Sequence, residues 1–353
     1  MYDTIEFRES SCKNSRERVF AAIKGKDFDV YPAITPTSVA TLEGMKASNA
    51  YFPAAHTHPI QMADLAAVGY EVFGFDSIAP YFSVHLEAAA LGAKVDFSDP
   101  NTTPFVTQRP MNKIDDFSLP SNFLAKQEFQ ALLKTISILK SRYKQSVPII
   151  GKVIGPWTLA YNLYGVENLI LDTILEPAKT QALITELSSI PLAFALAQFD
   201  AGADMITWAE HATSDLVSPQ IYERFLFPVH KKAANTIQVH GPLILHICGN
   251  VMDRLSLIAN TGIKLFHIDS RNPLKEALKI AGNSLILTGA INNPVSLVQG
   301  TPYSITQEVI RTFREGISLV SPECALPTNV PTQNLRAITE TAHHINPHTL
   351  PPM

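Results

Sequence analysis

The sequence predicts an α/β protein that folds as a single (β/α)8 TIM barrel. Short apolar runs rich in β-branched residues alternate with longer helical patterns, and eight such runs can be counted. The alternation is typical of a parallel sheet with crossover helices, and the count of eight matches the closed barrel. An open doubly wound sheet is the alternative, but no GxGxxG phosphate turn follows the first run.

The eight runs are the candidate strands. Each is short and apolar, and helical patterns separate them, as the barrel requires. In chain order they are Val30–Thr35, Ser77–Ser83, Ile149–Gly155, Ala203–Ala209, Pro242–Ile247, Lys264–Asp269, Ser284–Ala290 and Gly316–Ser321.

Three of the helical patterns are well defined. Leu216–Asn235 has apolar residues at the spacing of one helix face, and Ser214 or Asp215 is positioned to cap it. Val251–Thr261 and Ile305–Glu315 are each followed by a glycine, which suits a left-handed C-cap.

We expect one domain over residues 1–353. Residues 1–27 precede the first candidate strand, and we expect them to form an N-terminal helical arm. Residues 346–353 are expected to form a frayed tail. The interval from Glu87 to Gln145 is long for a barrel connection, so it is expected to hold an extra helix or a lid.

The composition excludes several functional classes. Hydrophobic residues make up 46% of the 353 residues and the net charge is −4, so no nucleic-acid partner is expected. No apolar run approaches the roughly 20 residues of a membrane span, so no membrane partner is expected. The charged N-terminus does not resemble a signal peptide, which predicts a cytoplasmic protein.

The chain has three cysteines, Cys12, Cys248 and Cys324. This odd, small number argues against a disulfide framework. His246 and Cys248 end the fifth strand in PLILHICGN, and residues two apart in a strand face the same way, with Cα atoms roughly 6.5 Å apart. Cys324 follows the eighth strand. Strand ends of a barrel open onto one face, so all three side chains can converge there.

Zinc is the metal that this trio predicts. Zinc accepts mixed nitrogen and sulfur ligands, and three protein ligands with an open fourth position are typical of a catalytic site. Two thiolates leave little net positive charge, so the ion suits an incoming thiol, which it deprotonates near neutral pH for attack on a methyl group. The alternative is two small buried cysteines beside a hydrogen-bonded core histidine.

Longer segments of the chain resemble the methylcobamide:coenzyme M methyltransferases of the uroporphyrinogen decarboxylase superfamily. The resemblance covers nearly the whole chain, and the spacing of the histidine and two cysteines is its most specific part. It is carried by Ser15–Pro32, His85–Phe97, Gly151–Ala160, Ser214–Pro228, His246–Asn250, Gly289–Pro302 and Ser321–Ile338.

The resemblance implies a uroporphyrinogen decarboxylase-like barrel with zinc bound by His246, Cys248 and Cys324. It further implies methyl transfer from a corrinoid (methylcobalamin) carried by a partner protein to a zinc-bound thiol such as coenzyme M. Asp269, at the end of strand six, is the candidate for a fourth ligand; a hydrogen-bonding role beside the metal is the alternative.

The sequence departs from the family pattern at two places near the expected site. Pro-Tyr-Phe-Ser at 80–83 replaces the family's Pro-Phe-Asp, and Glu323 precedes Cys324 where the family has glycine. These changes leave the methyl acceptor open. The enzyme could instead run the other half-reaction, in which a methyl-thiol or methyl-ether substrate donates its methyl group to a corrinoid.

Five further polar or aromatic residues follow strand ends. Glu210 and His211 could reach the mouth of the barrel, where Glu210 is a candidate proton acceptor or else a helix cap. Asn250 is expected at a helix N-cap, Asn292 at an anion-binding loop, and Trp157 against a corrin face or in the core.

Two other functions are weighed. Uroporphyrinogen decarboxylase binds a substrate with many carboxylates without a metal, yet Thr35–Ala40 after strand one contains no arginine and no aspartate occupies the expected place near Ser83. A non-enzymatic corrinoid carrier would need a DxHxxG motif, and the sequence has none.

Overall fold

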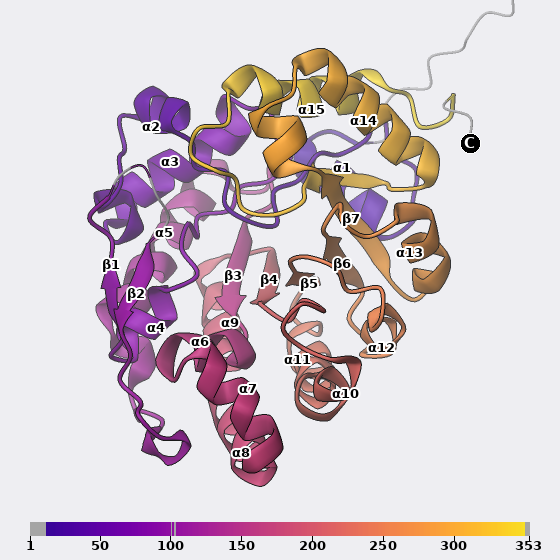
Figure 1. Cartoon of the computed structure of the whole chain (residues 1–353). Helices are drawn as coiled ribbons and strands as arrows, with labels where there is room; N and C mark the ends of the chain where they lie inside the picture. Colours follow the sequence, from indigo (N-terminus) through magenta and orange to yellow (C-terminus); the bar gives the residue numbers. More distant parts are fainter. Residues whose placement is uncertain (1–11, 100, 102–103, 350–353) are drawn as a thin grey trace, which may run out of the picture.

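The fold is built around a parallel sheet of the six later strands. The structure, a computed structural model, describes residues 12–99, 101 and 104–349. The strands pair in sequence order, each with the next, and Figure 1 shows them surrounded by helices. They are β3 (Ile150–Ile154), β4 (Met205–Glu210), β5 (Leu243–Ile247), β6 (Leu265–Ile268), β7 (Ile286–Ile291) and β8 (Leu319–Pro322).

Two short segments close this sheet into a ring. Ala33 pairs with Val320 of β8, and Ile78 pairs with Ile149 beside β3. The Asp76 backbone N–H donates to the Ala33 carbonyl at 2.6 Å, which joins the two segments to each other. The predicted (β/α)8 barrel is therefore confirmed, with its first two strands reduced to single bridges.

Side chains replace part of the backbone ladder in those two segments. The Ala33 N–H donates to Asp76 Oδ2 at 3.0 Å, and the Thr35 N–H donates to Ser77 Oγ at 2.7 Å. Pro32 and Pro36 flank this stretch, and proline has no N–H to donate. The first predicted strand is consequently too short in backbone bonds to form a regular ladder.

Helices cover the outside of the ring (Figure 1). They alternate with the strands as predicted, although four of them separate β3 from β4. Those after β3 are α6 (Pro156–Leu163), α7 (Val166–Leu175), α8 (Pro177–Leu187) and α9 (Ser189–Ala201); later ones are α10 (Pro219–Ile221), α11 (Phe227–Ile237), α12 (Leu255–Ala259), α13 (Leu274–Ala281), α14 (Pro302–Glu315) and α15 (Thr332–His344), with π-helical turns at Tyr222–Leu226 and Asn293–Val298.

Two of the predicted helices start later than expected. The pattern at Leu216–Asn235 becomes a helix only at Pro219, where Ser218 accepts a hydrogen bond from the Ile221 N–H. Neither Ser214 nor Asp215 is the cap. The helix expected at 251–261 is limited to α12, whereas the helix predicted to end before Gly316 does so, with that glycine at φ +119°.

The long interval between the second and third strands holds more structure than expected. It contains the predicted extra helix, α5 (Gln127–Tyr143), preceded by α4 (Leu86–Ala90). It also contains an antiparallel pair, β1 (Lys94–Asp96) and β2 (Phe105–Gln108), which the sequence did not reveal because each strand has only three or four residues. Before it lie α2 (Leu42–Ser48) and α3 (Pro59–Glu71).

The N-terminal arm closes one end of the barrel. Helix α1 (Ser15–Ile23) places Val19 and Ala22 against barrel residues that include Ile150 and Met205. The predicted helical arm is thus present over its described part, while residues 1–11 lie outside the described residues, as do residues 350–353 of the expected tail.

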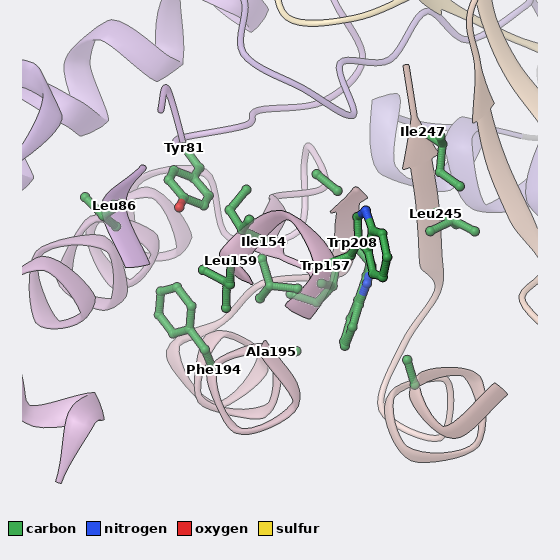
Figure 2. Close-up of a cluster of buried hydrophobic side chains, with 14 of the residues drawn as sticks. Tyr81, Leu86, Ile154, Trp157, Leu159, Phe194, Ala195, Trp208, Leu245 and Ile247 are labelled. Atoms are coloured by element: carbon green, nitrogen blue, oxygen red, sulfur yellow. The ribbon is translucent and has the colours of Figure 1, made fainter. Parts of the chain in front are cut away.

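One stretch is more apolar than we expected from the sequence. Residues Pro177–Ala201, which comprise α8 and α9, pass the length and composition test for a membrane span, with a hydropathy of 1.4. The expectation that no stretch approaches such a span was wrong on that test. Just over half of its most apolar window, 56%, is buried, and Phe194 and Ala195 belong to the cluster of Figure 2. Core helices of this kind pass the same test, so it is weak evidence for a membrane.

Candidate metal centre at the mouth of the barrel

His246, Cys248 and Cys324 meet at the carboxyl ends of β5 and β8. The His246 Nε2 lies 2.9 Å from Cys248 Sγ and 3.5 Å from Cys324 Sγ, and the two sulfurs are 3.1 Å apart. Within the described part of the chain, this trio is the one group of three or more potential ligands whose donor atoms converge. The predicted juxtaposition of strands five and eight is therefore present.

The donor set suits zinc in its chemistry. One imidazole nitrogen and two sulfurs are ligands that zinc binds tetrahedrally, and three of them leave one position open. The sulfurs are well beyond the roughly 2.05 Å of a disulfide. Two sulfurs on a tetrahedral zinc would be ~3.8 Å apart, so an ion would widen the 3.1 Å sulfur–sulfur distance by about 0.7 Å.

The two thiols share a hydrogen bond that makes them unequal. The contact with Cys248 lowers the pKa of Cys324 below its usual range, and the contact with Cys324, together with burial, raises the pKa of Cys248. Cys324 is therefore the more acidic of the two sulfurs. A thiolate is the form in which cysteine binds metal.

His246 is oriented by the neighbouring strand. Its Nδ1 lies 3.3 Å from the carbonyl of His267. A proton on Nδ1 would donate to that carbonyl and would leave the Nε2 lone pair directed at the sulfurs, the arrangement that second partners of metal-binding histidines usually impose. His246 thus has the orientation of a ligand rather than of a core histidine.

His267 ties β6 to the end of β8. Its Nε2 lies 2.7 Å from the carbonyl of Pro322, two residues before Cys324, and burial lowers the pKa of this imidazole. A Cβ atom at Gly289 of β7 would come within 2.9 Å of the His267 ring. The glycine therefore leaves the space through which His267 reaches past β7.

Asp269 supports the turn after Cys248. Its Oδ2 accepts from the Gly249 N–H at 2.8 Å and its Oδ1 from the Arg271 N–H at 2.9 Å. Asp269 is absent from the convergent ligand group. Of the two roles that the sequence left open, the geometry matches the hydrogen-bonding one.

The loop that carries Cys324 is held by Glu323 and Asn293. The Glu323 carboxylate accepts from the Ser270 N–H at 2.9 Å and from the Asn293 N–H at 2.8 Å, which joins the ends of β6, β7 and β8. The Asn293 side chain donates to the carbonyls of Cys324 and Ala325. In the sequence, Glu323 stood out only as a departure from the family.

The two predicted asparagines serve the backbone. Asn250 accepts from the Met252 N–H at 3.0 Å, which is a turn and not the helix cap we expected, because α12 begins only at Leu255. Asn292 caps the Asn293–Val298 turn and donates to Ser270 Oγ at 2.9 Å.

Glu210 and Trp157 lie away from the mouth, each in the second of the two roles that the sequence left open for it. Ala209 is the β4 residue in register with His246, so Glu210 faces outward toward the helices. Its carboxylate accepts from the Thr158 N–H at 2.9 Å and from Thr158 Oγ1 at 2.8 Å, at the start of α6. Trp157 is fully buried in the cluster of Figure 2 and is a core residue.

His211 remains at the mouth. It is exposed, its backbone N–H donates to Thr158 Oγ1 at 2.7 Å, and its imidazole is close enough for its charge to interact with Cys324 and His246. The structure therefore brings His211 near the trio. Asp269 is connected to the trio indirectly, through its hydrogen bond to the residue after Cys248.

Two charged residues inside the barrel escaped sequence reasoning. Lys152 of β3 and Glu87 of α4 are both buried. The Glu87 Oε1 accepts from the Ile154 N–H at 2.8 Å, while its Oε2 has no hydrogen-bond partner in the described residues. A lysine in the middle of an otherwise apolar strand was the signal that could have found this pair.

Comparison with known proteins gives a consistent picture. The family model described as uroporphyrinogen decarboxylase (URO-D) matches residues 14–345. The methylcobamide:CoM methyltransferase MtbA of Methanosarcina acetivorans is 31% identical over 93% of this chain and 97% of its own length.

Two further likenesses agree with it. A methylated-thiol–coenzyme M methyltransferase of Methanosarcina mazei is 32% identical over 91% of this chain and 86% of its own length. The solved structure of a methyltransferase from Methanosarcina mazei superposes with a TM-score of 0.89 at 27% identity, over 93% of this chain and 98% of that one.

Proposed function

The chain belongs to the uroporphyrinogen decarboxylase (URO-D) family, and from that premise we propose that it is a zinc-dependent methyltransferase. It moves a methyl group between a corrinoid carried by a partner protein and a small thiol. The observation that carries the proposal is the convergence of His246, Cys248 and Cys324 at the mouth of the barrel. The names of the similar methyltransferases supply the reaction class.

The three side chains would hold the ion through Nε2 of His246 and the two sulfurs. Two thiolates cancel the charge of a divalent ion, so the centre is a weak Lewis acid toward carbonyls. When bound, zinc would lower the pKa of an incoming thiol so that its sulfur is a thiolate near neutral pH.

The surrounding residues keep the donors in place. His267 accepts from His246 through its carbonyl and donates to Pro322, so one residue positions parts of both strands that carry ligands. Glu323 fixes the loop of Cys324 by accepting two backbone N–H groups. Partners of this kind raise metal affinity because the ligands need no rearrangement.

In the transfer, a sulfur–carbon bond forms as the cobalt–carbon bond breaks. The bonding electron pair stays on the cobalt, and the thiol proton leaves to solvent or to a base at the mouth. His211 is an exposed imidazole whose charge interacts with Cys324 and His246, so we assign it the role of proton acceptor in place of Glu210.

The opposite half-reaction is the second candidate. One of the similar relatives is named for a methylated thiol as well as for coenzyme M. A methylated thiol would then donate its methyl group to the corrinoid at the same centre. The two candidates differ in which partner carries the methyl group before the reaction.

Metal analysis with cysteine variants tests the proposal. We expect about one zinc per chain in the wild type, loss of zinc and of thiol-dependent methylcobalamin demethylation in Cys248→Ala and Cys324→Ala, and retention of both in Cys12→Ala, the matched control. Circular dichroism establishes that each variant is folded. Zinc with no turnover on any thiol, but with methyl transfer from a methylated thiol to cob(I)alamin, would favour the second candidate. A folded wild type that takes up no zinc refutes the metal centre.

A further inference from the structure

Lys152 lies inside the barrel and not among the helices that surround it. A Cβ atom at the preceding residue, Gly151, would come within 2.3 Å of Gln198 on α9, so that position faces outward. Successive residues of a strand face opposite sides, and Lys152 therefore faces the interior. Its Nζ lies 4.4 Å from the centre of the Tyr81 ring.

The ammonium group of Lys152 has no direct ion pair. Among the described residues, no carboxylate oxygen lies within 4.0 Å of the Lys152 ammonium. The residue as a whole is only 3% exposed. Burying an unpaired charge is costly. Burial accordingly lowers the pKa of Lys152 to about 8, so a negative group placed beside it would favour its ammonium form.

Glu87 does not fill that role. It interacts with Lys152 from a distance greater than that of an ion pair, and its Oε1 is already used by the Ile154 N–H. Burial raises the pKa of Glu87 to about 7, so this carboxyl group is only partly ionised at neutral pH. A second acidic group beside Lys152 is thus tolerated electrostatically.

Lys152 faces the same barrel interior as the candidate metal centre, one inward-facing position below it, because Ile154 is in register with Ala209 and Ala209 with His246. It is near enough to interact with the charges of both Cys324 and Cys248. Tyr81, which contributes its ring face to the ammonium, is itself buried and its hydroxyl has no hydrogen-bond partner in the described residues. One cation therefore lies below the trio, in contact with the ring of a tyrosine whose hydroxyl has no partner in the described residues.

We propose that Lys152 binds the acidic group of the thiol substrate, so that the enzyme selects small thiols that carry a sulfonate or a carboxylate over neutral ones. This inference rests on the proposed function, since it assigns the other end of the same substrate. The thiol sulfur reaches the trio while the acidic group pairs with Lys152 and lies beside the Tyr81 hydroxyl. Lys152 is a substrate-binding residue and takes no part in the transfer itself.

The test compares thiols that differ in charge. Methylcobalamin demethylation is measured with 2-mercaptoethanesulfonate, 3-mercaptopropionate and 2-mercaptoethanol, in the wild type, in Lys152→Met and in Lys152→Arg. Lys231→Met, which removes an exposed lysine of α11, is the matched control. The first two thiols distinguish a sulfonate from a carboxylate.

We expect the wild type to prefer an anionic thiol. Lys152→Met should reduce the ratio of kcat/KM for that thiol over 2-mercaptoethanol by about 10- to 100-fold, the range for one charge-assisted hydrogen bond. Lys152→Arg should keep much of the ratio, and Lys231→Met all of it. An unchanged ratio in a folded, zinc-loaded Lys152→Met protein overturns the inference.

Two measurements separate this inference from the proposed function. Binding of ethanesulfonate, which has no thiol, is measured by calorimetry and needs no turnover; it should be present in the wild type and lost in Lys152→Met. Its persistence in that variant would overturn the role of Lys152, whereas wild-type binding without turnover on any thiol would refute only the methyl transfer. The thermal midpoint of Lys152→Met should be equal to or above that of the wild type, because an unpaired buried charge is removed; a large decrease would indicate a structural pairing with Glu87 instead.

Discussion

Asp76→Asn should destabilise the protein by about 3 kcal/mol. The Asp76 carboxylate is buried and accepts from Arg18 at 2.8 Å, from His343 at 2.7 Å and from the Ala33 N–H at 3.0 Å. An asparagine of the same size presents its NH2 group to at least one of these donors. A hydrogen bond to a charged group contributes about 1.5–3 kcal/mol.

The estimate is limited by what remains after the substitution. Arg18 keeps Asp29 as a bidentate partner at 2.9 Å, so its charge stays paired, and the loss is below the sum of three bonds. With unfolding entropy of ~2.1 cal/mol/K per residue, a chain of 353 residues loses about 4 °C in Tm for ~3 kcal/mol.

Differential scanning calorimetry at pH 7 is the assay. Asp64→Asn is the matched control, because Asp64 pairs with Arg142 at 2.8 Å on the surface, where such pairs contribute less than ~1 kcal/mol. Its Tm should fall by about 1 °C or less. If Tm decreases equally in the two variants, the Asp76 carboxylate does not hold the first two barrel segments together. That result would refute the inference that side chains replace part of the backbone hydrogen bonding there.

Three further predictions concern the barrel interior and the site. Glu87→Gln should gain stability relative to the wild type as pH rises from about 4.5 to about 7, because burial raises the pKa of Glu87 from 4.5 to about 7 and the folded wild type must ionise it over that window; urea unfolding at pH 5 and pH 7.5 measures this, and an equal difference at both pH values contradicts it. Gly155→Ala should cost about 1–3 kcal/mol, since its Cβ would come within 2.0 Å of Glu210; a wild-type urea midpoint would show that the carboxylate can move. Glu323→Gln should weaken zinc binding about 10- to 100-fold in competition with a chelator while the circular dichroism spectrum is kept, and unchanged affinity would remove Glu323 from the support of Cys324.

The later strands could be predicted from the sequence because each is a short, mostly apolar run that is almost entirely buried. The first two could not be predicted in their observed form. Their backbone donors pair with the side chains of Asp76 and Ser77, and no local pattern reports a partner so far away in the sequence. The β1–β2 pair was missed because runs of three and four residues carry no periodicity.

The ligand trio could be predicted because strand parity and barrel topology together bring its members to one place. The same alternation of inward and outward side chains, applied to β4, would have placed Glu210 outside, since it follows the inward-facing Ala209. Asp269 has the correct parity, yet its oxygens are taken by the backbone of its own loop and of the loop after β5. Competition for hydrogen bonds of this kind depends on loop geometry, which the sequence alone does not give.

The separation of the ligands along the chain has a consequence for the order of synthesis. Cys248 and Cys324 are 76 residues apart, and Cys324 follows the last strand of the ring. A nascent chain that has emerged only through the loop after β5 holds His246 and Cys248, which are two of the three metal donors and would bind an ion weakly. Metal capture must therefore wait until β8 has docked beside β7, so that zinc content, measured on ribosome-bound or truncated chains, would record the moment at which the barrel is completed.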